Sequence, residues 1–179
     1  MLKKTERLER NLIAKGSIID YYRDTMKIPN GNTATWDYID HKGAAAVVAV
    51  TKEGRILMVR QYRNALERET LEIPAGGLNS RQEPMEEAAK RELQEETGFK
   101  AGSMEFLVSI RTTVAFCNER IDIFYAHDLT EGSQHLDEDE FVEVTSYPIE
   151  ELIQMIYDGQ IQDSKTISGL MCYYNKYCK

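Results

Sequence analysis

The sequence predicts a mixed α/β protein, an α/β/α sandwich built on a mixed sheet, with a small antiparallel β hairpin or sheet at its N-terminus. Three observations support this fold class. Strand-like runs precede a helical segment near the middle of the chain, further strand-like runs follow it, and two helical segments come last. Such an order is typical of helices packed on both sides of a sheet. The 179 residues are enough to bury one good core.

The N-terminal part is expected to contain the hairpin. Residues 5–15 are rich in charge and fit either a short helix or a mobile segment. The runs 17–28 and 33–40 alternate between apolar and polar residues, and the turn-forming sequence Pro29-Asn30-Gly31-Asn32 separates them. We therefore expect residues 1–41 to form an N-terminal hairpin region and residues 42–179 to form the main domain.

The remaining elements follow from apolar runs and turn signals. Residues 44–50 are small, apolar and β-branched, as in a buried strand, and Glu53-Gly54 turns the chain into residues 55–61, the second strand of the same hairpin. Further strands are expected at 69–73, 104–112, 121–127 and 141–147, and helices at 149–157 and 164–177.

The segment GLNSRQEPMEEAAKRELQEETGF, from Gly77 to Phe99, predicts a helix with clear ends. Pro84 suits the first turn of a helix, and Gly98 suits the left-handed residue that follows one. Three small or apolar residues can face a core, namely Ala88, Ala89 and Leu93. Glu87 and Arg91, four residues apart, are expected to pair, and Glu83 is expected to pair with Arg91 and so brace the preceding loop against the helix.

Carboxylates crowd one face of this helix. Glu92 and Glu96 are one turn apart, and Glu95 lies beside them. Like charges at this spacing repel in water, whereas Mg²⁺ prefers carboxylate oxygens and brings substrate phosphates with it. Such a charge run is most often a solvated helix face. The fixed spacing of the surrounding residues, with the turn Pro74-Ala75-Gly76-Gly77 before the helix, favours a metal site instead.

That spacing resembles the Nudix box, the signature of hydrolases that cleave nucleoside diphosphates linked to another group, and every fixed position of the box is filled. The run RQYRNALERETLEIPAGG, which starts at Arg60, is similar to the ADP-ribose pyrophosphatase branch of that family, as is IQDSKTI at 161–167, where Asp163 would cap the last helix. The resemblance spans about residues 16–175. It implies a Nudix-type α/β/α sandwich and a homodimer, with the N-terminal hairpin as the dimerisation element.

The resemblance also implies an activity. This activity is the hydrolysis of the pyrophosphate bond of a nucleoside diphosphate sugar. The reaction would depend on Mg²⁺, with Mn²⁺ as the alternative metal. ADP-ribose is the favoured substrate, giving AMP and ribose 5-phosphate. The metal ligands would be Glu92, Glu96, Glu95 and the carbonyl of Gly76. These ions would neutralise the diphosphate and lower the pKa of the attacking water, and Glu95 is also a catalytic candidate.

Other site residues are implied in the same way. Arg63 would contact the diphosphate, and Glu72 would lie near the metals or the terminal ribose. Arg60 fits a phosphate contact and a surface ion pair equally well. In the acidic stretch Asp137–Glu140, which by charge alone is a solvated loop, Glu140 is the first candidate and Glu138 the second for the base that takes a proton from water.

Two aromatic residues are candidates for stacking on a purine ring. Trp36 is either a half-exposed strand residue or such a platform, and Phe116 is a weaker candidate of the same kind. One departure from the branch concerns its Ser-Pro-Gly-Phe turn, which reads Thr113-Val114-Ala115-Phe116 here. This puts the substrate in doubt, so GDP-mannose, another nucleotide sugar, a diadenosine polyphosphate and a non-catalytic ADP-ribose sensor remain alternatives.

The composition limits the class of partner. The net charge of −8 argues against nucleic acid and anionic membranes as partners, and leaves a small-molecule substrate as the expected one. Three cysteines without CxxC spacing fit a reducing cytoplasm. No run reaches the length of a signal peptide core or a membrane span, so we expect a cytoplasmic enzyme.

Overall fold

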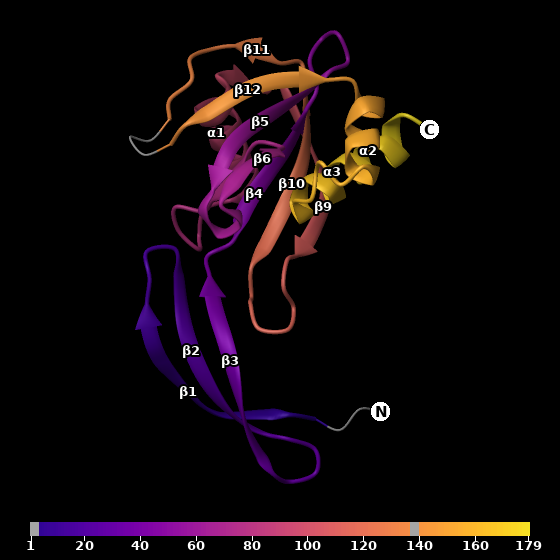
Figure 1. Cartoon of the computed structure of the whole chain (residues 1–179). Helices are drawn as coiled ribbons and strands as arrows, with labels where there is room; N and C mark the ends of the chain where they lie inside the picture. Colours follow the sequence, from indigo (N-terminus) through magenta and orange to yellow (C-terminus); the bar gives the residue numbers. More distant parts are fainter. Residues whose placement is uncertain (1–3, 137–139) are drawn as a thin grey trace. The chain divides into compact units, whose positions relative to one another are not determined.

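The computed structural model describes residues 4–136 and 140–179 (Figure 1). The chain divides into two compact units. The N-terminal unit contains the residues up to Gly43 together with Arg111–Arg120, and the second unit contains Ala44–Ile110 and Ile121–Lys179. The domain boundaries expected from the sequence, 1–41 and 42–179, stay a prediction. Glu138 lies outside the described residues.

The N-terminal unit holds a three-stranded antiparallel sheet in the order β1-β2-β3, formed by β1 (Glu6–Lys15), β2 (Ile19–Lys27) and β3 (Thr33–His41). The expected turn is present, with Gly31 at φ 92°. The expectation of a short helix or a mobile segment at residues 5–15 is wrong. Arg10 of β1 lies opposite Asp24 of β2, donates hydrogen bonds of 2.7 and 2.6 Å to its carboxylate, and covers the ring of Tyr38 at 3.5 Å. These cross-strand contacts compensate the charge that made the segment look unstructured.

A mixed four-stranded sheet forms the centre of the second unit, in the order β7-β4-β10-β9. The strand β4 (Ala44–Ala49) is buried along its whole length, as expected. It pairs in parallel with β10 (Arg120–His127) and antiparallel with β7 (Ala75–Gly77), and β9 (Ser103–Arg111) lies beyond β10. A strand with a neighbouring strand on each side and helices on each face is shielded from water, which explains its apolar sequence.

A second sheet has the antiparallel order β12-β5-β6, formed by β12 (Val142–Tyr147), β5 (Ile56–Arg63) and β6 (Arg68–Glu72). The prediction that residues 44–50 and 55–61 form one hairpin is wrong. The turn forms, with Gly54 at φ 74°, but between β4 and β5 only the bridge of Val50 with Ile56 is made. The residues Ile56–Val59 are buried and pair with β12 in the other sheet, and from Val59 onwards β5 also pairs with β6. Short elements complete the unit, namely η1 (Asn64–Leu66), β8 (Phe99–Lys100) and β11 (Thr130–Glu131).

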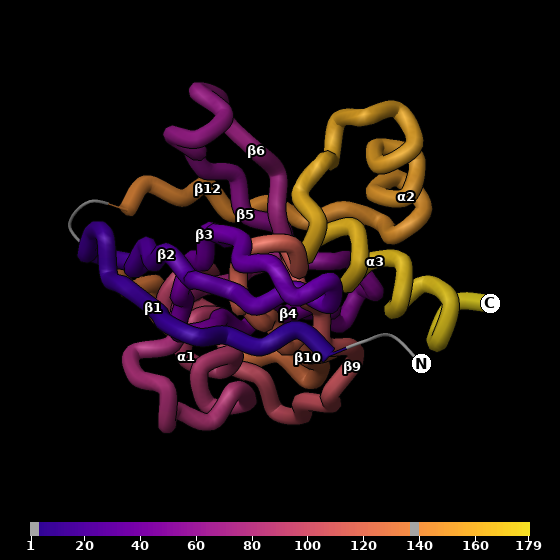
Figure 2. The backbone as a smooth tube through the Cα atoms, turned by 90° about the horizontal axis from the view of Figure 1, so that it is seen from below, coloured from indigo at the N-terminus to yellow at the C-terminus, as the bar shows by residue number. Residues whose placement is uncertain are grey.

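Three helices cover the central sheet, namely α1 (Met85–Thr97), α2 (Ile149–Tyr157) and α3 (Ser164–Tyr177). Successive residues of β4 point to opposite faces. Ala46 and Val48 pack in the core shared with α2 and α3, whereas Ala45 and Val47 pack in the core shared with α1. Figure 2 shows α1 and α3 on opposite sides of β4. The α/β/α sandwich is therefore confirmed. Within the described residues, no helix is long and apolar enough to span a membrane.

Candidate active site

The helix α1 begins and ends where its sequence predicts. Pro84 directly precedes it in an extended conformation, and Gly98 directly follows it at φ 77°. A side chain at that φ would be strained, which explains the glycine. Ala88, Ala89 and Leu93 are fully buried, as expected. This anchoring fixes which face of α1 remains for the carboxylates.

Two of those carboxylates are buried. Glu92 is 8% exposed and Glu96 is 3% exposed, and the Oε2 atom of Glu96 accepts a hydrogen bond of 2.9 Å from the backbone N–H of Ala75. Burial raises the pKa of Glu96 to about 8, against the opposing effect of the Ala75 N–H, and the negative charges of Glu92 and Glu140 add to the rise. Burial likewise raises the pKa of Glu92 to about 7, against the opposing effect of Arg91. The cluster therefore carries more negative charge than its surroundings stabilise.

The neighbouring strand β7 approaches this cluster without a side chain. A β-carbon on Gly76 would lie 2.2 Å from the Cδ atom of Glu92. The backbone of β7 and the two buried carboxylates therefore share one space. Carboxylate and carbonyl oxygens are the donors that a hard divalent cation prefers, so Glu92, Glu96 and the carbonyl of Gly76 suit such an ion.

Arg91 occupies part of the cluster as it stands. Its guanidinium contacts Glu83 at 3.1 Å, Glu92 at 2.6 Å and Glu95 at 2.8 Å, and it donates a 3.1 Å hydrogen bond to the carbonyl of Gly77. Over residues 4–136 and 140–179, no three His, Cys, Asp or Glu side chains converge closely enough to hold a metal ion as placed. A bound cation would therefore have to compete with Arg91 for Glu92.

These contacts test two sequence predictions. The expected brace between Glu83 and Arg91 is confirmed. The expected pair of Glu87 with Arg91 is not among the contacts of Arg91, and Glu87 instead contacts Lys90 at 3.0 Å. Three acids and a carbonyl on the inner side attract the guanidinium more strongly than one exposed carboxylate does.

Of the two candidates for the base, Glu140 lies within the described residues and Glu138 does not. The negative charge of Glu140 contributes to the raised pKa of both Glu92 and Glu96. The Glu140 carboxylate is therefore close enough to interact electrostatically with the cluster. This proximity is not evident from sequence spacing, since more than forty residues separate Glu96 from Glu140.

A second charged network lies at the ends of β5 and β6. Arg63 donates two hydrogen bonds to Glu72, of 2.8 and 2.6 Å, and Lys165 at the start of α3 donates one of 2.5 Å to the same carboxylate. Burial alone would raise the pKa of Glu72, but these partners and Thr70 lower it to about 2. Arg60 lies on the same strand three residues before Arg63, so its side chain points to the opposite face.

Sequence reasoning missed Lys165. Its Nζ atom also donates to Asp163 at 2.9 Å, and Asp163 accepts a hydrogen bond of 2.9 Å from the N–H of Thr166, which confirms the predicted cap of α3. A lysine two residues after a capping aspartate is unremarkable in a sequence. The sequence carries no signal for its contact with Glu72, because Glu72 lies 93 residues earlier in the chain.

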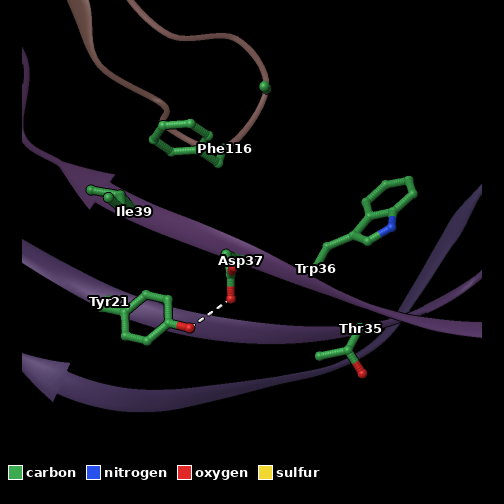
Figure 3. Close-up of a pocket in the computed structure, with 7 residues that line it drawn as sticks. Tyr21, Thr35, Trp36, Asp37, Ile39 and Phe116 are labelled. Atoms are coloured by element: carbon green, nitrogen blue, oxygen red, sulfur yellow. Dashed lines mark hydrogen bonds between the residues drawn. The ribbon is translucent and has the colours of Figure 1, made fainter.

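The N-terminal unit holds a pocket of about 650 Å³ that brings Trp36 and Phe116 together (Figure 3). The backbone N–H of Ile39 donates a 2.7 Å hydrogen bond to the carbonyl of Phe116, which ties the loop to β3. Trp36 is 48% and Phe116 46% exposed, so both rings are partly open to a ligand. The full lining is Tyr21, Thr35, Trp36, Asp37, Ile39, Ala115 and Phe116.

The loop that carries Phe116 forms a turn without the family's proline and glycine. The N–H groups of Phe116 and Cys117 donate to the carbonyl of Thr113 at 3.3 and 3.0 Å. Val114 is 83% exposed at its tip and Ala115 lines the pocket. The turn therefore stays compact although Val114 and Ala115 replace the proline and glycine. The side chains that the loop presents at these two positions are different.

Comparisons with known proteins identify the family of this chain and several relatives. The NUDIX domain matches residues 40–169. The chain is 41% identical over 166 residues to an ADP-ribose pyrophosphatase of Bacillus subtilis (strain 168), with 89% of each chain covered. It is 40% identical to a methanol dehydrogenase activator of Bacillus methanolicus, covering 92% of this chain and 89% of that one. A crystal structure of an ADP compounds hydrolase superposes with a TM-score of 0.86 at 22% identity, covering 98% and 95% of the two chains.

The protein belongs to the Nudix family, and it is a Nudix hydrolase. The superposition also confirms the predicted mixed α/β fold.

Proposed function

We propose that this enzyme hydrolyses the pyrophosphate bond of a nucleoside diphosphate sugar in a Mg²⁺-dependent reaction, with ADP-ribose as the favoured substrate and AMP and ribose 5-phosphate as products. The observation that carries the proposal is the pair of buried carboxylates, Glu92 and Glu96, against the bare backbone of Gly76. Relatives named ADP-ribose pyrophosphatase, at 41% and 33% identity, support the choice of substrate.

The metal would be held by Glu92, Glu96 and the carbonyl of Gly76, and Mn²⁺ would serve in place of Mg²⁺. When bound, such an ion neutralises phosphate charge and lowers the pKa of a nearby water. The residues of the chain do the rest. Arg63, at the end of β5, orients the diphosphate through its planar guanidinium. Glu140 takes the proton of the attacking water as a general base.

The pocket of the N-terminal unit would bind the base of the nucleotide. Indole and phenyl rings stack on any base through their π faces, so Trp36 and Phe116 supply affinity. Asp37, whose carboxylate accepts a 2.6 Å hydrogen bond from the Tyr21 hydroxyl, supplies a polar edge. The N-terminal sheet also remains our candidate for a homodimer contact, which a measurement of mass in solution would test.

A substrate panel tests the proposal. Release of phosphate-containing products is measured with Mg²⁺, with and without EDTA, from ADP-ribose, GDP-mannose, UDP-glucose and a diadenosine polyphosphate. We expect metal-dependent cleavage of ADP-ribose well above the others. Preferred cleavage of another member would reject ADP-ribose and point to the loop at Thr113–Phe116. Tight binding of ADP-ribose without cleavage of any member would reject catalysis and indicate a sensor.

A further inference from the structure

We propose that Lys165 is a positioning residue, which keeps Glu72 neutralised while Arg63 leaves that carboxylate to bind the substrate diphosphate. This inference rests on the proposed function of Arg63 as the diphosphate-binding residue. It gives Lys165 a role that is distinct from attaching α3 to the sheet.

Each oxygen of Glu72 has two partners. The Oε1 atom accepts hydrogen bonds from Arg63 Nε at 2.8 Å and from the Thr70 hydroxyl at 2.6 Å. The Oε2 atom accepts from an Arg63 terminal nitrogen at 2.6 Å and from Lys165 Nζ at 2.5 Å. If Arg63 turns away, each oxygen therefore keeps one donor, and the carboxylate keeps one full positive charge beside it.

Exposure shows which of the two cations can leave. The side chain of Arg63 is 40% exposed, whereas that of Lys165 is 10% exposed. Lys165 is also held by Asp163 at 2.9 Å, and Asp163 is itself fixed as the cap of α3. Both cations line a cavity of about 420 Å³. Only Arg63 combines a half-open position with a single anionic partner, so it is the group that can exchange Glu72 for a phosphate.

The exchange depends on the charge that stays behind. Glu72 is 2% exposed, and a buried carboxylate without a compensating cation is strongly unfavourable. Without Lys165, Arg63 would be the only cation in contact with Glu72 and would be retained there. Loss of Lys165 should therefore withdraw Arg63 from the substrate, and the two residues should act as one unit.

A purely structural role makes a different prediction. If Lys165 only joins α3 to β6, its loss lowers stability and reduces activity independently of Arg63. The two defects would then multiply in the double variant, as they do for independent sites. A double-mutant cycle separates the two roles.

The cycle uses K165M, R63Q and K165M/R63Q in the full-length chain. The readout is kcat/KM for ADP-ribose in the presence of Mg²⁺, and thermal unfolding checks that each variant is folded. We expect R63Q to lower kcat/KM by roughly 100-fold and K165M by nearly as much, and the double variant to match R63Q alone. Multiplying defects, or a fully active K165M, would overturn the inference. The matched control is K176M on the same helix, which should leave kcat/KM unchanged in either background.

Two further variants keep the test decisive. If K165M does not fold, K165Q replaces it in the cycle, because its amide still donates a hydrogen bond but carries no charge, and the same coupling is expected. K165R retains the charge and should restore activity to within about threefold of wild type. A wild-type enzyme that neither cleaves nor binds any member of the panel overturns the proposed function and this inference together. An active wild type with an impaired R63Q, but no coupling to Lys165, overturns this inference alone.

Discussion

Gly76 and Glu92 are packed so closely that any side chain at position 76 would displace the Glu92 carboxylate. A β-carbon on Gly76 would lie 2.2 Å from both the Cδ and the Oε2 atoms of Glu92 and 2.3 Å from Oε1. The conformation of Gly76 is not left-handed, so its requirement arises from this contact alone. The close approach of β7 to α1 therefore depends on the absence of a side chain at Gly76.

The substitution G76A should displace the Glu92 carboxylate and lower kcat/KM on the order of 100-fold, since small shifts of a catalytic group have effects of that size. Steady-state kinetics with Mg²⁺ check this. The matched control is G77A, because a β-carbon on Gly77 meets nothing within 4 Å. Equal activity of the two variants would contradict the placement of Glu92 in the site.

The substitution E96Q should separate activity from stability. A neutral amide cannot replace an anionic metal ligand, so turnover should fall roughly 1,000-fold or more. In EDTA above pH 8, where the Glu96 carboxyl of the wild type is ionised, the variant should unfold at the same or a higher temperature, because it lacks a buried charge that Glu92 and Glu140 repel. Wild-type turnover in E96Q would reject α1 as the metal platform.

The ion network around Glu72 predicts a pH dependence of stability. The pKa of Glu72 is lowered to about 2, below its ordinary value, so the stabilisation is complete above pH 5 and is lost as the pH falls towards 2. We expect E72Q to be less stable than wild type by about 3 kcal/mol at pH 7. Denaturant unfolding at pH 7, 4 and 2.5 should show that the stability difference between E72Q and wild type becomes smaller as the pH falls. A difference that stays constant would contradict the lowered pKa.

Removal of the indole should affect substrate binding more than chemistry. Base stacking on an aromatic side chain contributes about 1–3 kcal/mol, so W36A should raise KM for ADP-ribose about 5- to 150-fold with little change in kcat. The control is Y62A, which removes an aromatic ring that is 60% exposed on β5 and is not among the residues that line the pocket. If W36A and Y62A behave alike, the pocket does not bind the base.

The general base can be identified by comparing two neighbouring acids. E140Q should lower kcat by roughly 100- to 10,000-fold, as expected for the loss of a general base. E143Q, three residues further along the chain on β12, should leave kcat within about twofold of wild type. The kcat values at saturating ADP-ribose give the comparison. An active E140Q would move the role to another acid.

Much of the fold was predictable because its signals are local. The helices α2 and α3 have the bounds that Pro148 and the Asp163 cap suggest. The strand β1 was missed because its stabilising contact joins Arg10 to Asp24 across two strands. The supposed hairpin of residues 44–61 failed for a similar reason, since the partners of β5 are β12 and β6 rather than its neighbour in sequence.

The candidate site shows the same division. Glu92, Glu95 and Glu96 sit within two turns of one helix, so their spacing alone indicated a cluster. Lys165 was not predictable in this way, because its partner Glu72 is 93 residues earlier in the chain. The proximity of Glu140 to the cluster likewise depends on the packing of the sheet against α1.

The N-terminal unit is assembled from two separate pieces of the chain, and this has a consequence for the order of synthesis. Ile39 is translated long before its partner Phe116, and the whole of α1 lies between them in the sequence. On the ribosome, the helix α1 therefore emerges before the pocket that Trp36 and Phe116 line can be completed. A gene fragment that ends at residue 43 would encode the three-stranded sheet but only part of that pocket. A transplant of the sheet alone would therefore leave out Ala115 and Phe116, which complete the lining of the pocket.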